Sequence, residues 1–175
     1  MNRNSIIFTN VFRFLLLVFI QVFILRRMVI AEGFWDYFQF FLYPLFIFLL
    51  PFSYSRYLVI ILGFFVGLTV DMFYDTLGVH AAAGTFTGYM RYRVLKWLEP
   101  KGGYNVNFSP TKSRMGNSWF LPYVSILLLC HIFVYFCAEQ FSPVYALDII
   151  ISTVASFVAS FSIIMVVQVI FNPKQ

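Results

Sequence analysis

Residues 63–88, GFFVGLTVDMFYDTLGVHAAAGTFTG, decide the fold that we predict for this chain. Small and acidic residues recur there at every fourth position, which places them on one face of a helix: Gly63, Gly67, Asp71 and Asp75. After a break at Gly78, the same spacing separates two further glycines, Gly84 and Gly88. Smooth faces of this kind let two helices approach closely. We therefore expect a packed helical hairpin.

The composition around this stretch is typical of an integral membrane protein. Of the 175 residues, 61% are hydrophobic and 11% are charged, and the mean hydropathy is +0.84, whereas globular proteins contain about 25% charged residues. Long apolar runs without period-two alternation favour helical spans over a β-barrel. The two cysteines, Cys130 and Cys137, have no neighbouring Cys/His pair. Neither a disulfide framework, nor a metal site, nor a cofactor is predicted.

Hydropathy predicts an all-α fold with a single polytopic membrane domain over residues 1–175. The six expected spans cover about 6–25, 35–52, 57–77, 79–98, 119–138 and 149–171, and a polar loop covers 99–118. The second span contains Pro44, where we expect a kink.

The fourth span contains too few uncharged residues to cross a bilayer without help. Only the 12 residues 79–90 are uncharged, about 18 Å of helix against a hydrocarbon core of about 30 Å. Either its basic side chains snorkel to the headgroups, or the segment re-enters without crossing.

Lys and Arg residues are concentrated at the end of this span and in the loop after it, at Arg91, Arg93, Lys96, Lys101, Lys112 and Arg114. The positive-inside rule places this region in the cytoplasm in two models. One has six spans and a cytoplasmic N-terminus; the other has five, with 79–98 not crossing and the N-terminus outside. The charges leave both models open. In either, we expect a cytoplasmic basic surface against anionic membrane lipids, and no nucleic acid as partner because the cations border a span.

Asp71 lies about 9 Å from the end of its predicted helix, inside hydrocarbon. An unpaired carboxylate there costs at least about 2.5 to 3.5 kcal/mol. Arg13 and Gln21 on the first span are the intramembrane polar partners that we consider, and Gln21 matches the depth of Asp71 better in the six-span model. We favour a structural clamp between helices over an ion or proton site, because no second deep acid accompanies Asp71. Asp75, one turn later, is expected near the interface.

The two histidines have structural interpretations. His131 is expected to be a satisfied core histidine, and His80 a polar residue at the start of a helix. The sequence contains no nucleophile elbow, zinc-protease motif or P-loop. We therefore predict no enzyme and no catalytic residue.

The run Gly63-Phe-Phe-Val-Gly67-Leu-Thr-Val-Asp71, followed by Leu77-Gly78-Val79-His80-Ala81-Ala82 and then Tyr89, resembles the rod-shape-determining MreD family. The resemblance implies a multi-pass protein of the bacterial inner membrane with six helices and both termini cytoplasmic. It also implies a fold related to the substrate-binding S components of energy-coupling-factor vitamin transporters. Family members act in the complex that inserts peptidoglycan along the side wall of rod-shaped cells.

The partners that this resemblance implies are MreC, as the direct one, and three further members of the complex: the actin-like MreB filament, a RodA-type glycosyltransferase and a class B penicillin-binding transpeptidase. We expect a non-enzymatic scaffold whose smooth, polar-tipped hairpin and neighbouring helices hold the membrane helix of MreC, with the glycines as the favoured contact. The alternative is a solute-binding or transport subunit of the S-component type, with a pocket for a small solute such as a vitamin near Asp71.

Overall fold

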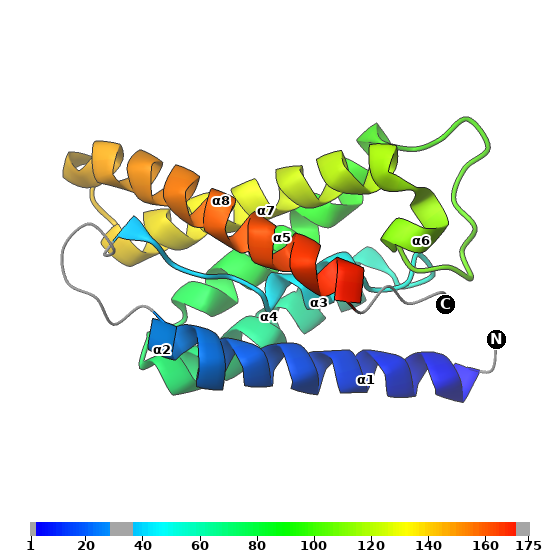
Figure 1. Cartoon of the computed structure of the whole chain (residues 1–175), viewed down its shortest axis with the longest axis horizontal. Helices are drawn as coiled ribbons and strands as arrows, with labels where there is room; N and C mark the ends of the chain where they lie inside the picture. Colours follow the sequence, from blue (N-terminus) through cyan, green and yellow to red (C-terminus); the bar gives the residue numbers. More distant parts are fainter. Residues whose placement is uncertain (1–2, 29–36, 171–175) are drawn as a thin grey trace.

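The computed structural model describes residues 3–28 and 37–170, which form an all-helical bundle (Figure 1). The first element is continuous and comprises α1 (Arg3–Phe19), the π-helical stretch η1 (Ile20–Leu25) and α2 (Arg26–Met28). It is followed by α3 (Pro44–Phe48), α4 (Arg56–Tyr74) and α5 (Val79–Trp97). The last elements are α6 (Lys112–Met115), α7 (Asn117–Gln140), the 3₁₀ turn η3 (Pro143–Tyr145) and α8 (Ala146–Ile170).

Among the described residues, four helical stretches are long and apolar enough to cross a membrane: Ile7–Met28, Arg56–Tyr74, Asn117–Gln140 and Pro143–Ile170. Many large apolar side chains on these stretches point outward rather than into the bundle, as expected where the solvent is lipid. The predictions of an all-α fold and of transmembrane helices are confirmed at this level.

The bundle has two distinct ends. We call the end formed by the start of α1, residues 51–55 and the loop between α5 and α7 the loop end, and the opposite end, with α2 and the turn between α4 and α5, the hairpin end. Asn10, in the first half of α1, donates to the hydroxyl of Tyr54, which lies just before α4 at the loop end. Gln21, in η1, donates to the hydroxyl of Tyr74, the last residue of α4, toward the hairpin end. The first helix and α4 therefore run in the same direction. In Figure 1 the start of α1 and the end of α8 both lie on the side of α6, which is the loop end.

Residues 37–50 run through the middle of the bundle as a buried and partly extended chain. Only Pro44–Phe48 is helical, with Pro44 starting the helix, and every residue from 41 to 50 is buried. The prediction of a kinked helical span over 35–52 is therefore wrong in its described part; residues 35 and 36 lie outside the described residues. Proline lacks the N–H of a helix interior and disfavours helical geometry in the residue before it.

Side chains from two neighbouring helices satisfy the backbone of this extended chain. Ser156 and Ser160 of α8 each accept a hydrogen bond at 2.9 Å, from the N–H groups of Gln39 and Phe41. Gln21 in η1 uses both ends of its amide, accepting from one N–H at 2.7 Å and donating to one carbonyl at 2.8 Å. Non-helical backbone at membrane depth requires such internal partners. These three side chains therefore explain how an extended segment lies where a helix was predicted.

The other predicted spans agree with observed helices to within about one turn. The doubtful segment 79–98 forms one continuous helix, α5, which packs between α4 and α7. It is not one of the four apolar stretches. Three of its polar residues, His80, Thr87 and Arg91, are buried in the bundle, whereas Arg93 and Lys96 are exposed.

Candidate functional site: the Asp71 hairpin

The glycines of residues 63–88 lie at the contact between α4 and α5. A Cβ on Gly63 or on Gly84 would overlap the backbone carbonyl of the other residue, and one on Gly67 would overlap the carbonyl of His80. A Cβ on Gly88 would lie 2.9 Å from the backbone of α4. The expected hairpin is therefore present. The expectation that this face holds a partner's helix is wrong as stated, because backbone of the same chain already fills it.

Asp71 closes the hairpin by capping the start of α5. Its Oδ1 accepts from the backbone N–H of His80 at 3.0 Å, its Oδ2 accepts from the N–H of Ala81 at 2.9 Å, and the Thr76 hydroxyl donates to Oδ1. Gly78 adopts a left-handed conformation with φ of +85° at the turn, which a glycine permits at little cost. A carboxylate is favourable at a helix N-terminus because it meets free N–H groups and the positive end of the helix dipole.

The clamp that we predicted from Asp71 to the first span is not formed. The salt-bridge partner of Asp71 is His80, and the amide of Gln21 is taken up by the extended chain and the Tyr74 hydroxyl. Arg13 lies half-buried in α1. A structural clamp exists, but it joins α4 to α5, because the turn at Gly78 brings the start of α5 back onto Asp71.

His80 is the functional candidate that sequence reasoning undervalued. Its side chain is fully buried, and its Nδ1 lies 3.0 Å from Asp71 Oδ1. With an ionised Asp71, this geometry assigns the proton to Nδ1 and leaves Nε2 as an acceptor. Nε2 has no hydrogen-bond partner among the described residues. The signal in the sequence was an acid and a histidine on either side of a glycine turn.

A pocket of about 290 Å³ opens beside His80 at the hairpin end. We call it the hairpin pocket. It is lined by polar and aromatic residues from several elements: Gln21, Arg26, Gln39, Phe40, Phe41, Tyr74, Thr76, His80, Tyr135 and Glu139. Tyr135 donates its hydroxyl hydrogen to Glu139 at 2.9 Å. The acceptors His80 Nε2 and Glu139 give this pocket the chemistry to receive a hydrogen-bond donor.

Asp75 ends α4 at the rim of the hairpin end. It adopts a left-handed conformation with φ of 56° and pairs with Arg26 at 3.3 Å, while its own side chain is 85% exposed. Exposed ion pairs contribute little to stability. The expectation of an interfacial Asp75 agrees with this position.

His131 is the satisfied core histidine that we predicted. Its Nε2 lies 2.8 Å from the Tyr43 hydroxyl, and its Nδ1 lies 2.7 Å from the Thr87 hydroxyl. The ring thereby joins α7 to α5 and to the extended chain. Both nitrogens are used, so His131 is not available for chemistry on a ligand.

The predicted basic surface is wrong for Arg91. Its side chain is buried inside the bundle, where Nε donates to the Tyr123 hydroxyl at 3.1 Å and Nη2 donates to the Leu50 carbonyl. Since Tyr123 in turn donates to the Phe48 carbonyl, these two side chains satisfy backbone groups at and just after the end of α3. The remaining residues of the predicted surface are exposed or half-buried: Arg93, Lys96, Lys101, Lys112 and Arg114.

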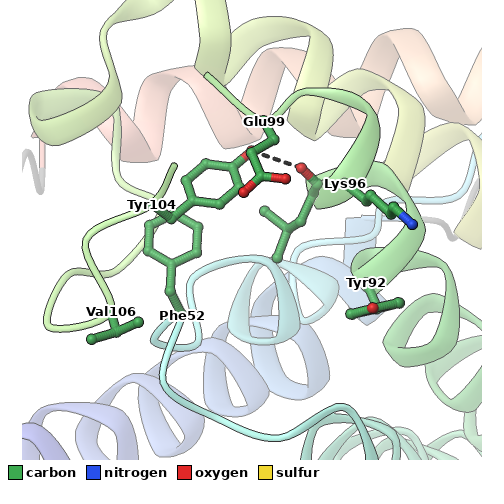
Figure 2. A pocket seen from close by; sticks show the side chains of 7 residues that line it. Phe52, Tyr92, Lys96, Glu99, Tyr104 and Val106 are labelled. Carbon is green, nitrogen blue, oxygen red and sulfur yellow. Dashed lines mark hydrogen bonds between the residues drawn. The ribbon is translucent and has the colours of Figure 1, made fainter. Parts of the chain in front are cut away.

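The loop that carries several of these cations is held against the bundle by aromatic residues (Figure 2). The Tyr104 ring stacks on that of Phe52 with 4.5 Å between centroids, and its hydroxyl donates to the Leu95 carbonyl at 2.8 Å. Burial raises the pKa of Tyr104 to about 12, so its phenol stays neutral at physiological pH. The loop is therefore an ordered part of the loop end.

Comparison with known proteins finds no matching family model, no similar curated protein and no similar solved structure.

Proposed function

We propose that this protein is a non-enzymatic scaffold of the MreD type in the bacterial cell-elongation complex. In this proposal it binds MreC and supports side-wall peptidoglycan synthesis and rod shape together with MreB, a RodA-type glycosyltransferase and a class B penicillin-binding transpeptidase. The observation that carries the proposal is that the residues of the resemblance act as one unit. Gly63 and Gly67 admit α5, Asp71 caps it, and Gly78 makes the turn.

The proposed topology has six crossings of the inner membrane and both termini in the cytoplasm, in a fold related to S components. Four crossings are the apolar helices. The extended chain 37–50 and α5 supply the other two. Residues 41–50 are all buried, and α5 packs between α4 and α7. The start of α1 and the end of α8 both lie at the loop end (Figure 1), which supports an even number of membrane crossings. The cations of the loop end favour a cytoplasmic location for that end.

Because the glycine face is filled, the helix of MreC must bind an outward apolar face in this proposal. Three residues on three different helices point outward and have similar exposed fractions: Phe12 on α1 is 57% exposed, Phe65 on α4 is 54% exposed and Val158 on α8 is 58% exposed. A photo-cross-linking amino acid at each position in living cells tests them in parallel. We expect an MreC adduct at one of the three positions and rounding of rod-shaped cells upon depletion of the protein. Absence of any adduct, together with rods that keep their shape, would refute the scaffold.

A second candidate function is a solute-binding or transport subunit of the S-component type. The hairpin pocket favours it, because its lining includes His80 and Glu139. Nε2 of His80 is a buried acceptor without a partner among the described residues, and an unsatisfied buried acceptor costs about 1 to 3 kcal/mol. Mass spectrometry of the purified protein and a thermal-shift screen of vitamins test this function. A bound solute, and a shift that is lost in Glu139→Gln, would support it. An empty protein without any shift would exclude the screened vitamins.

A further inference from the structure

Arg91 carries a full positive charge into the loop end without a carboxylate beside it. Its side chain is only 3% exposed, and no described carboxylate forms an ion pair with it; Asp75 pairs with Arg26, and Asp71 bonds to His80. Among the described residues, its guanidinium donates to a hydroxyl and to a carbonyl, both neutral. A guanidinium stays protonated in proteins, and buried charges are ordinarily paired. The surroundings of Arg91 therefore favour an anion.

Arg91 lines a pocket of about 320 Å³ between the start of α4 and the second half of α5. We call it the loop-end pocket. Among the described residues, its lining contains two arginines and no acidic residue: Phe52, Tyr54, Ser55, Arg56, Val59, Gly88, Arg91, Tyr92 and Leu95. Arg56 is the first residue of α4, so the positive end of a 19-residue helix also faces this region. The Arg56 guanidinium lies over the Tyr57 ring at the edge of this pocket and donates to the Tyr57 hydroxyl. A pocket lined by two arginines, beside a helix N-terminus and with no carboxylate among its described lining residues, suits a phosphate group.

The position of the loop-end pocket matches the headgroup layer of a bilayer. Arg56 begins one of the four apolar stretches, and exposed aromatic residues surround this level: Tyr57, Tyr89, Tyr92 and Trp97. Tyr and Trp are enriched at the membrane–water interface, and cations there attract anionic lipids. A ligand from the bilayer thus reaches the pocket without crossing either hydrocarbon or the bundle.

A second pocket of about 390 Å³ adjoins the first, because both are lined by Phe52, Tyr92 and Leu95. Figure 2 shows this neighbour, with Tyr92 and Lys96 on one side and Tyr104 and Val106 on the other. Its lining adds Lys96 to the cations of the region and also holds Glu99. The loop-end pocket, which holds no acid, is the better place for the phosphate, while the apolar wall shared by the two pockets suits the adjoining part of a lipid.

We propose that the loop-end pocket binds the headgroup phosphate of an anionic glycerophospholipid, with Arg91 and Arg56 as its cationic donors. This site does not depend on the scaffold function. It gives the buried charge of Arg91 a partner and places a lipid between the start of α4 and the second half of α5.

The test uses the full chain in a neutral detergent, titrated with phosphatidylglycerol or with phosphatidylcholine of the same acyl chains. Native mass spectrometry counts bound lipid, and a thermal melt gives the apparent affinity. We expect phosphatidylglycerol to bind at least about tenfold more tightly than phosphatidylcholine, and Arg56→Gln to weaken it about fivefold to tenfold. Arg93→Gln is the matched control, because it removes the same charge from an exposed residue of α5 that lies over the Tyr89 ring and does not line the pocket.

Arg91→Gln is expected to abolish the preference for phosphatidylglycerol if the variant folds; if it does not fold, Arg56→Gln alone decides. Three results would overturn the proposal. The first is equal loss in Arg56→Gln and Arg93→Gln, which indicates diffuse attraction to the basic surface. The second is equal binding of both lipids. The third is full replacement of phosphatidylglycerol by inorganic phosphate at the same concentration, which indicates a site for a free anion.

Discussion

Replacing Asp71 by Asn should destabilise the protein by about 3 to 5 kcal/mol. Asp71 Oδ1 and Oδ2 together accept from two backbone N–H groups, from the Thr76 hydroxyl and from His80 Nδ1. Asn keeps one acceptor oxygen but turns an NH₂ group toward the Ala81 N–H, so one hydrogen bond is lost and the three at the remaining oxygen are no longer charge-assisted. Hydrogen bonds to a charged group contribute about 1.5 to 3 kcal/mol each.

Denaturant unfolding of the detergent-solubilised protein, followed by tryptophan fluorescence, measures this loss. Asp75→Asn is the matched control, since it makes the same change one turn later on an exposed side chain, in a left-handed conformation that Asn tolerates. The control should stay within about 0.5 kcal/mol of the wild type. An Asp71→Asn variant as stable as the control would refute the assignment of Asp71 as the cap that closes the hairpin.

Three further predictions concern the hairpin, the extended chain and the loop. Gly67→Ala should destabilise the protein by about 1 to 3 kcal/mol, because the new methyl group overlaps the His80 carbonyl. Gly102 has open space around it, so Gly102→Ala should leave the stability unchanged in the same unfolding assay. Gln21→Leu should cost about 2 to 4 kcal/mol, because backbone groups of the extended chain lose their partners; wild-type stability would show that water replaces the amide. The raised pKa of Tyr104, about 12 against an ordinary 10.0, favours the neutral phenol in the folded state. This contribution is therefore present below pH 10 and is lost as the pH rises toward 12, and a melting series in this range should show a steeper decline for the wild type than for Tyr104→Phe.

The hairpin could be predicted from the sequence because its information is local. Glycines at a spacing of four mark the helix face that admits another backbone, and the break at Gly78 lies between them. The partner of Asp71 was mistaken because the carboxylate bonds the backbone at the start of the next helix. Free backbone N–H groups are present at the start of every helix, whatever its residues, so the sequence does not show which helix start a carboxylate will cap.

The extended chain could not be predicted because an apolar run around Pro44 has the same appearance in a buried helix and in a buried extended segment. Its conformation is decided by hydrogen bonds to Ser156 and Ser160, more than 100 residues away in the sequence. Arg91 was misplaced for a related reason. It belongs to a basic cluster, yet the rotation of α5 against α7 points this one side chain at Tyr123, while Arg93 stays outside.

The central claim, that this hairpin protein is a membrane scaffold of the MreD type, is tested most directly by purifying the tagged full chain from membranes in mild detergent and identifying its partners by mass spectrometry. We expect MreC to co-purify in a fixed ratio with the wild type and with Asp75→Asn, and the complex to be lost or depleted in Asp71→Asn, whose hairpin is weakened. Recovery of the folded wild-type protein without MreC would refute the scaffold proposal.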